Sequence, residues 1–207
     1  MMPSTILVFI LLTTTQVYCQ SAVNDTDTFC DVTDPSLLCD PDNILPEDSS
    51  EKLCATINEI NNGSVCVCDN CTTLVENGYT MAVAMVAELD RDNGGFSVAE
   101  NLRQEWLNTK TICDDSIVVV YSNYNEQLFI VMGEPLERLI SNSTIDQLYE
   151  ECKSMNSVLE CLENTVTKLD EAVTKAIEDE KDNLIWGILG LLAIVTILSF
   201  HYYVKDY

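Results

Sequence analysis

Acidic side chains are the most abundant groups in this chain that could carry out chemistry. Two pairs of neighbouring carboxylates, Asp40 with Asp42 and Asp114 with Asp115, are of interest, because carboxylates at a sheet edge can hold a divalent metal that hydrolyses phosphate esters. A chain with 34 acidic residues also brings acids together by chance. We therefore assign no catalytic residue, cofactor or metal, and regard Asp40, Asp114 and Asp115 as the candidates for a metal site.

Three other kinds of site are disfavoured. The single histidine, His201, lies in an apolar segment, which removes Ser-His-Asp and Cys-His hydrolases. The stretch 90–95 (DRDNGG) begins like a calcium loop, but its fifth position is a glycine and the glutamate that follows comes one residue early. The stretch 66–71 (CVCDNC) has the cysteines of a zinc knuckle with no histidine nearby. A strand-to-helix turn and disulfides are the better interpretations of these two stretches.

The cysteines indicate an oxidising compartment. Cleavage of a signal peptide after Cys19 leaves nine cysteines, which we expect to form mostly disulfides. Because nine is odd, we expect one thiol to be free or to bridge to a partner chain. The disulfide candidates are Cys30, Cys39, Cys54, Cys66, Cys68, Cys71, Cys113, Cys152 and Cys161.

Net charge and glycosylation motifs narrow the possible partners. The formal net charge is −24, so the surface repels nucleic acid and attracts cations. Four Asn-x-Ser/Thr motifs agree with a glycosylated extracellular surface. The predicted glycosylation sites are Asn24, Asn62, Asn70 and Asn142.

Apolar segments near both ends predict a single-pass protein of the plasma membrane with its N-terminus outside. The segment 184–204 is 21 residues long, so as a helix it would measure about 32 Å, enough to cross a hydrocarbon core of about 30 Å. The predicted segments are a signal peptide (1–19), a flexible acidic leader (20–38), an extracellular domain (39–151), a membrane-proximal helix (152–183), a transmembrane helix (184–204) and a cytoplasmic tail (205–207).

The predicted span and tail restrict where a partner can bind. Small residues recur in the span, and Gly187, Gly190 and Ala193 are candidates for close helix packing. A three-residue tail is too short to recruit cytoplasmic effectors, so we expect partners to meet the ectodomain, the span or both.

Hydrophobic periodicity predicts an α/β domain with a small mixed sheet between helices. A helix is expected at 47–60, a buried strand at 79–89, and a helix that starts at a capping box formed by Ser97 and Glu100. The segment 64–71 is expected to be a strand or a pinned loop. Strands at 116–121 and 128–133 should form a hairpin, and a further helix should start near Thr144 with a cap at Ser143. The predicted order is helix, strand, helix, strand, strand, helix.

An apolar heptad repeat marks the last helix before the span. Its apolar residues step by three and four, which is typical of a helix that buries one stripe. The stripe either packs against the domain's own sheet or pairs with another chain as a stalk, and the first interpretation is favoured. The residues of this stripe are Leu159, Leu162, Val166, Leu169, Val173 and Ala176.

Several of these stretches together resemble one known family. They are the CDP motif at 39–41 with Ile44 and Leu45, the strand YTMAVAMVAEL at 79–89, the helix segment 102–106, and CDDSIVVVYSNYNEQLFIVMG at 113–133. Over residues 38–151 the chain resembles the modulator of levamisole receptor family, an invertebrate branch of the TPM domain superfamily. Ser116 stands where the family often has a third acidic residue.

The resemblance implies a TPM-type α/β fold and an auxiliary role rather than an enzyme. The best-described member is an accessory subunit of levamisole-sensitive acetylcholine receptors, so the expected partners are subunits of a ligand-gated cation channel. Some TPM relatives are acid phosphatases, which makes a metal-dependent ectophosphatase using Asp114, Asp115 and Asp40 the first alternative. A surface adhesion glycoprotein is the second.

Overall fold

A computed structural model describes residues 37–68, 78–89, 94–106 and 114–205, with side chains up to residue 197 except that of Trp106. The signal peptide, most of the leader, the loop 90–93 and the sites Asn24, Cys30, Asn70, Cys71 and Cys113 lie outside these residues and stay predictions.

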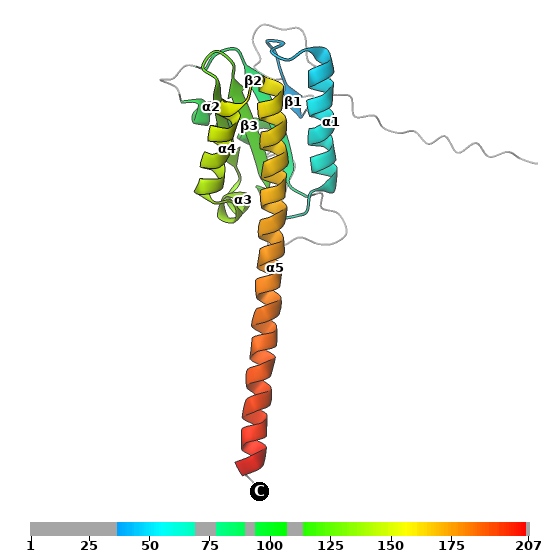
Figure 1. Cartoon of the computed structure of the whole chain (residues 1–207), viewed down its shortest axis with the longest axis vertical. Helices are drawn as coiled ribbons and strands as arrows, with labels where there is room; N and C mark the ends of the chain where they lie inside the picture. The colour runs from blue at the N-terminus through cyan, green and yellow to red at the C-terminus, as the bar shows by residue number, and fades with distance from the viewer. Residues whose placement is uncertain (1–36, 69–77, 90–93, 107–113, 206–207) are drawn as a thin grey trace, which may run out of the picture.

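A four-stranded mixed sheet lies at the centre of the folded domain, in the order β1-β2-β3-β4 (Figure 1). The strands β1 (Leu38–Cys39), β2 (Thr80–Val86) and β3 (Ser116–Ser122) are parallel, and β4 (Gln127–Met132) runs antiparallel to β3. The apolar runs of β2 and β3 are buried on both faces, as expected for central parallel strands. β4 alternates between buried and half-buried residues, as expected for a strand at the edge of the sheet.

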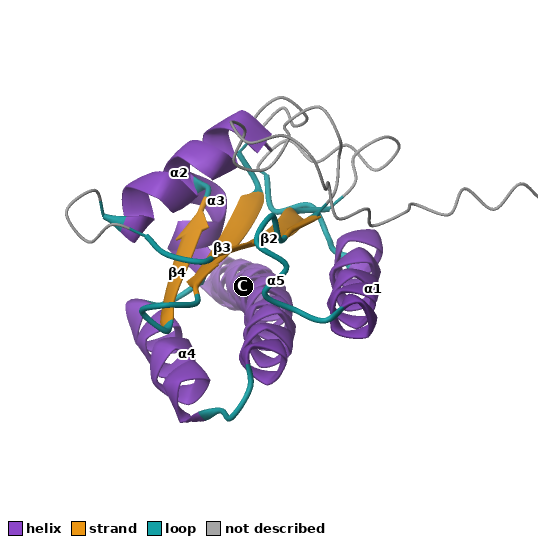
Figure 2. Ribbon diagram, turned by 90° about the horizontal axis from the view of Figure 1, so that it is seen from above, coloured by secondary structure: helices purple, strands orange, loops and turns teal. Residues whose placement is uncertain are grey.

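Helices cover both faces of the sheet, which makes three layers (Figure 2). One face packs against α1 (Glu47–Gly63), α3 (Glu134–Leu139), α4 (Asn142–Ser154) and the start of α5 (Val158–Lys205). The other face packs against α2 (Gly95–Trp106). The predicted mixed α/β class is therefore confirmed.

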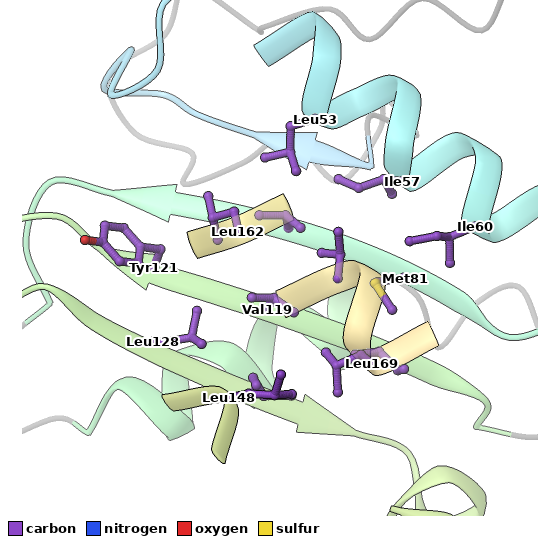
Figure 3. Packing of buried hydrophobic residues seen from close by; sticks show 14 of the residues in the cluster. Leu53, Ile57, Ile60, Met81, Val119, Tyr121, Leu128, Leu148, Leu162 and Leu169 are labelled. Carbon is purple, nitrogen blue, oxygen red and sulfur yellow. The ribbon is translucent and has the colours of Figure 1, made fainter. Parts of the chain in front are cut away.

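The larger core lies between the sheet and α5 (Figure 3). Leu162 and Leu169 of α5 are fully buried, and Met81 and Val119 of the sheet belong to the same cluster. The apolar stripe of the last helix thus packs against the domain's own sheet, which confirms the favoured interpretation. Leu159 and Ala176 at the two ends of the stripe are only half-buried.

Both helix caps predicted from sequence are wrong. α2 starts at Gly95, and the Glu100 carboxylate accepts hydrogen bonds from Arg103 and Gln104 instead of reaching back to Ser97. α4 starts two residues before Thr144, because the Ser141 hydroxyl accepts the backbone N–H of Thr144 at 3.2 Å.

One short helix differs from the prediction, and one segment matches an alternative that the prediction left open. The short helix α3, with Pro135 in its first turn, was not predicted, because six residues carry too little periodicity to recognise. Residues 64–68 form a loop in which Cys66 and Cys68 are disulfide-bonded, which agrees with the pinned loop that was one of the two predicted alternatives.

α5 continues well beyond the domain as one uninterrupted helix (Figure 1). Val173 is the last fully buried residue, and Ile177 still packs partly against the core. From residue 184 to residue 197 the apolar side chains are exposed, and no atom of the described residues lies within 4 Å of a Cβ atom placed on Gly187 or Gly190. Among the residues whose side chains are described, no helix contains an apolar stretch long enough and low enough in charge to count as a membrane span.

Candidate functional site

Asp40 closes the loop between β1 and α1. Its two carboxylate oxygens accept the backbone N–H groups of Ile44 and Leu45 at 2.8 and 2.9 Å, and its side chain is buried. Asn43, within this loop, has a φ of 51°, which asparagine tolerates better than most residues. The carboxylate of Asp40 therefore serves the local fold.

Asp114 belongs to an ion-pair network centred on Arg103 of α2. Arg103 is 6% exposed, and its guanidinium donates to both carboxylate oxygens of Glu100 at 2.6 and 2.9 Å and also to Asp114. A third bond of 3.2 Å reaches the Ser116 hydroxyl at the start of β3. These contacts join α2 to β3 and leave the Asp114 carboxylate next to a fixed positive charge.

The network has a clear electrostatic signature. The hydrogen bonds from Arg103 hold the pKa of Glu100 below its ordinary value. Hydrogen bonds to Glu100, and secondarily to Asp114, raise the pKa of Arg103. A fixed guanidinium beside Asp114 competes with a divalent cation for that carboxylate, which disfavours metal binding there.

Asp115 is buried beside two cysteines. The Sγ atoms of Cys66 and Cys68 and a carboxylate oxygen of Asp115 all lie within 4.8 Å of one another. Both cysteines are disulfide-bonded, so they cannot act as thiolate ligands. The two cysteines therefore agree with the disulfide interpretation, and their bonded sulfur atoms are not available to zinc as thiolates.

The three candidate metal ligands do not come together. Asp40 follows the carboxyl end of β1, and Asp114 precedes the amino end of β3. Because these strands are parallel, the two residues lie at opposite ends of the strands. Within the described ranges, the only grouping of three or more potential metal ligands is the one with Cys66, Cys68 and Asp115. The geometry provides no common site for Asp40, Asp114 and Asp115.

A set of polar contacts instead fixes α5 to the domain. The buried Tyr79 hydroxyl, at the start of β2, donates to the Asp170 carboxylate, and burial followed by this bond raises the pKa of Tyr79. Two turns earlier on the same face of α5, Lys52 of α1 forms an ion pair of 2.7 Å with Glu163. These residues were missed in the sequence, because their partners are more than 90 positions apart.

α4 is attached to α5 in two further ways. The disulfide between Cys152 and Cys161 joins the end of α4 to the start of α5. The Glu151 carboxylate accepts hydrogen bonds from Lys168 at 2.6 Å and from Asn164 at 3.1 Å, and with a bond from Gln147 these lower its pKa to about 2. α5 is therefore connected to the sheet, α1 and α4 as one unit.

Two exposed aromatic residues stand out at the carboxyl edge of the parallel strands. Tyr124, in the turn after β3, is 76% exposed, and Phe96, in the first turn of α2, is 53% exposed. Outside α5, the only other exposed large apolar residue among those described is Val65, at 41%. Sequence reasoning missed this pair, although an aromatic residue inside the polar turn 122–127 (SNYNEQ) is a recognisable signal of exposure.

The profile of one protein family matches this chain. It is described as Modulator of levamisole receptor-1, and it matches residues 13–126, which is more than half of the 207 residues. The chain belongs to this family. The matched segment runs through β1, α1, β2, α2 and β3 and ends in the turn before β4, so the modulator family profile includes Tyr124 and Phe96 and does not include α5.

Comparisons with curated proteins and with solved structures do not add to the family assignment. A search of curated proteins finds no match. Among solved structures, the chain is similar to the BA42 protein of the psychrophilic bacterium Bizionia argentinensis, determined by NMR, with a TM-score of 0.48 and 12% identity over 66% of this chain and 86% of that one.

The cysteines of this family member agree with an oxidising compartment. All six cysteines in the described ranges are disulfide-bonded. A free thiol or a bridge to a partner chain is therefore left to the cysteines outside those ranges.

Proposed function

We propose that this chain is an auxiliary subunit of a ligand-gated cation channel of the levamisole-receptor type. It is anchored in the plasma membrane by residues 184–204 with the folded domain outside, and the domain contacts the receptor's outer part. The match to the modulator family over residues 13–126 carries this proposal.

The continuous helix α5 supports the proposed anchoring. Its first four turns are packed in the domain core, and its apolar side chains from residue 184 to residue 197 face solvent on all sides. Exposure of this much apolar surface is unfavourable in water and is relieved by lipid or by a partner helix. Such an arrangement connects the domain to its anchor without a loop.

The proposed modulation follows from differential binding. An auxiliary subunit changes gating when it binds the open or primed receptor more tightly than the closed one, and a difference of about 1–3 kcal/mol is typical of such coupling. The role requires no catalytic group in the domain. No described contact favours the ectophosphatase alternative, since Asp40 and Asp114 are engaged at opposite ends of the strands.

Co-expression with levamisole-gated receptor subunits tests the proposal. We expect the full chain to shift the agonist dose–response curve and to co-purify with the receptor subunits in mild detergent. A matched chain in which 184–204 is replaced by an unrelated apolar helix of equal length separates the ectodomain's contribution from that of the span. Identical currents at every agonist dose, with both proteins at the cell surface, would refute the proposal.

A further inference from the structure

The directions of the helices show which end of the folded domain lies toward the apolar part of α5. Lys52, near the start of α1, pairs with Glu163, near the start of α5, and Figure 1 shows that these two helices run in the same direction from this contact. α4 runs the opposite way, because Cys152 at its end is bonded to Cys161. The end of α1 and the start of α4 therefore both lie toward the apolar part of α5, as Figure 1 shows.

The carboxyl ends of the parallel strands lie at the other end of the domain. β1 ends there and its chain enters the start of α1, whereas Tyr79 at the amino end of β2 bonds to Asp170 farther along α5. The edge that follows β2 and β3 is thus the end of the domain farthest from the apolar part of α5. In open α/β sheets the carboxyl ends of the strands are where ligands usually bind.

This far end carries exposed aromatic and acidic side chains on loops that are connected by hydrogen bonds. The backbone N–H of Ala87 donates to the Asp42 carboxylate at 2.7 Å, and the N–H of Tyr124 donates to the carbonyl of Ala87 at 2.8 Å. We call this surface the aromatic-acidic pole. Its exposed residues are Asp42, Glu88, Phe96, Tyr124 and Glu126.

Phe96 is held in place next to the same turn. Its ring makes an edge-to-face contact with Phe129 of β4, with the ring centres 5.3 Å apart. Gly95 permits this contact, because a Cβ atom there would lie 2.2 Å from the Phe129 ring. The Phe96 ring is thus positioned by the fold while remaining 53% exposed.

We infer that the aromatic-acidic pole is the surface that binds the receptor, and that its partner is an outer-domain surface of a receptor subunit bearing arginine or lysine side chains. Exposed aromatic rings beside carboxylates suit a guanidinium or ammonium group, which stacks on the ring and pairs with the acid. This inference rests on the proposed function and names the contact that the proposed function requires.

Charge disfavours three other occupants of this pole. A second copy of the chain would bring acid against acid, and the net charge of −24 also opposes anionic lipid and nucleic acid. The two exposed glycosylation motifs among the described residues, at Asn62 and Asn142, lie at the opposite end of the domain, so glycans attached there leave the pole uncovered. A basic protein surface remains.

Paired substitutions in the full chain, co-expressed with levamisole-gated receptor subunits, test the inference. Phe96→Ser with Tyr124→Ser should weaken co-purification by about tenfold or more, as is typical for central aromatic contacts. Glu88→Gln with Glu126→Gln should weaken it less and should mainly reduce its dependence on salt. Tyr124→Ser alone is the safeguard against misfolding, because its exposed ring takes no part in core packing.

Matched controls lie at the other end of the domain. Val65→Ser removes the one other large apolar side chain that is exposed among the described residues outside α5, and Glu134→Gln with Glu137→Gln removes two exposed acids of α3. We expect both controls to bind like the wild type. If the wild type binds the receptor and the Tyr124 and Phe96 variants bind it equally well, this inference is overturned and the proposed function still stands. Absence of wild-type binding would overturn the proposed function as well.

Discussion

Arg103 shows how a single residue decides what the neighbouring carboxylates do. The sequence places Asp114 before a strand, which is a position where a metal ligand is plausible. The structure supplies a guanidinium from α2 that pairs with Asp114 and Glu100 and is itself buried. The carboxylate is thereby used to attach α2 to β3.

Replacing Arg103 tests this structural role. Arg103→Met removes the cation and leaves two carboxylates facing each other, so we expect a loss of about 1.5–3 kcal/mol in the free energy of unfolding. Thermal unfolding of the purified full chain in mild detergent measures it. Lys153→Met is the control, because the Lys153–Glu150 pair is exposed and should contribute less than about 0.5 kcal/mol. Equal losses in the two variants would contradict the assigned role.

Glu151 gives the domain a pH-dependent contact. Its pKa in the folded state is about 2, below the value of about 4.3 for an unperturbed glutamate. A depressed folded pKa stabilises the fold above pH 4.3, and this contribution is lost as the pH falls toward 2.

Glu151→Gln should therefore flatten the dependence of the melting temperature on pH between about 4.3 and 2. Lys168→Met, which removes the cation that pairs with Glu151 at 2.6 Å, should produce a similar flattening. Melting temperatures of the three proteins at matched pH values check this. A slope in the Glu151→Gln variant equal to that of the wild type would show that the Glu151 contacts do not contribute.

At the scale of elements, α5 combines a core helix and a projecting helix in one segment. Ile177 is its last residue packed on the core, and seven residues later Leu184 begins the apolar part. The intervening residues are exposed and rich in acids, and the helix passes through them without a break. A change in the position of the domain is therefore transmitted directly to the apolar part.

Breaking the helix in this interval tests the transmission. Glu180→Pro removes a backbone donor and disrupts the helix by about 3 kcal/mol without touching the core, whereas Glu180→Ala removes the same charge and keeps the helix. Under the proposed function, Glu180→Pro should reduce the shift in agonist sensitivity while Glu180→Ala preserves it. Recordings at equal surface expression compare them, and equal shifts would mean that the continuous helix is not needed.

The strands and the longer helices could be predicted because their sequence patterns are strong. The run in β3 is rich in branched apolar residues, and the run in β2 is apolar over nearly its whole length. The apolar residues of α5 recur at a regular spacing and pack against the sheet. The caps could not be predicted as well, because Ser141 and Ser143 offer similar hydroxyls two residues apart. Geometry, and not residue type, decides that Ser141 accepts the bond.

The candidate site was less predictable than the fold. A carboxylate such as Asp40 looks the same in sequence whether it holds a metal or two backbone N–H groups. The partners that decide its role come from the folded loop, at Ile44 and Leu45. The exposure of Tyr124 likewise depends on how its turn rests on the end of β2.

At the scale of the whole molecule, charge determines how the domain meets a partner. Fields from exposed acids extend about 10 Å at 0.1 M salt and about 3 Å at 1 M. A basic partner surface is thus attracted at short range, and this attraction affects the rate of association more than the lifetime of the complex.

Raising the salt concentration should therefore weaken binding to the receptor mainly through slower association. We expect the association rate of the purified full chain with receptor in detergent to fall several-fold between 0.05 and 0.5 M salt, with little change in dissociation. Sucrose at equal osmolality serves as the control. Association that is insensitive to salt would mean that the charge of −24 does not guide the encounter.

Because α5 leaves the domain as an unbroken helix, it also fixes the rotation of the domain about the helix axis. Each residue of an α-helix turns the chain by about 100° and advances it by about 1.5 Å. The interval from Ile177 to Leu184 thus sets both the height of the domain above the apolar part, about 10 Å, and its azimuth around the helix axis. Deleting one residue there would lower the domain by little more than the length of a covalent bond and would turn Tyr124 and Phe96 by more than a right angle.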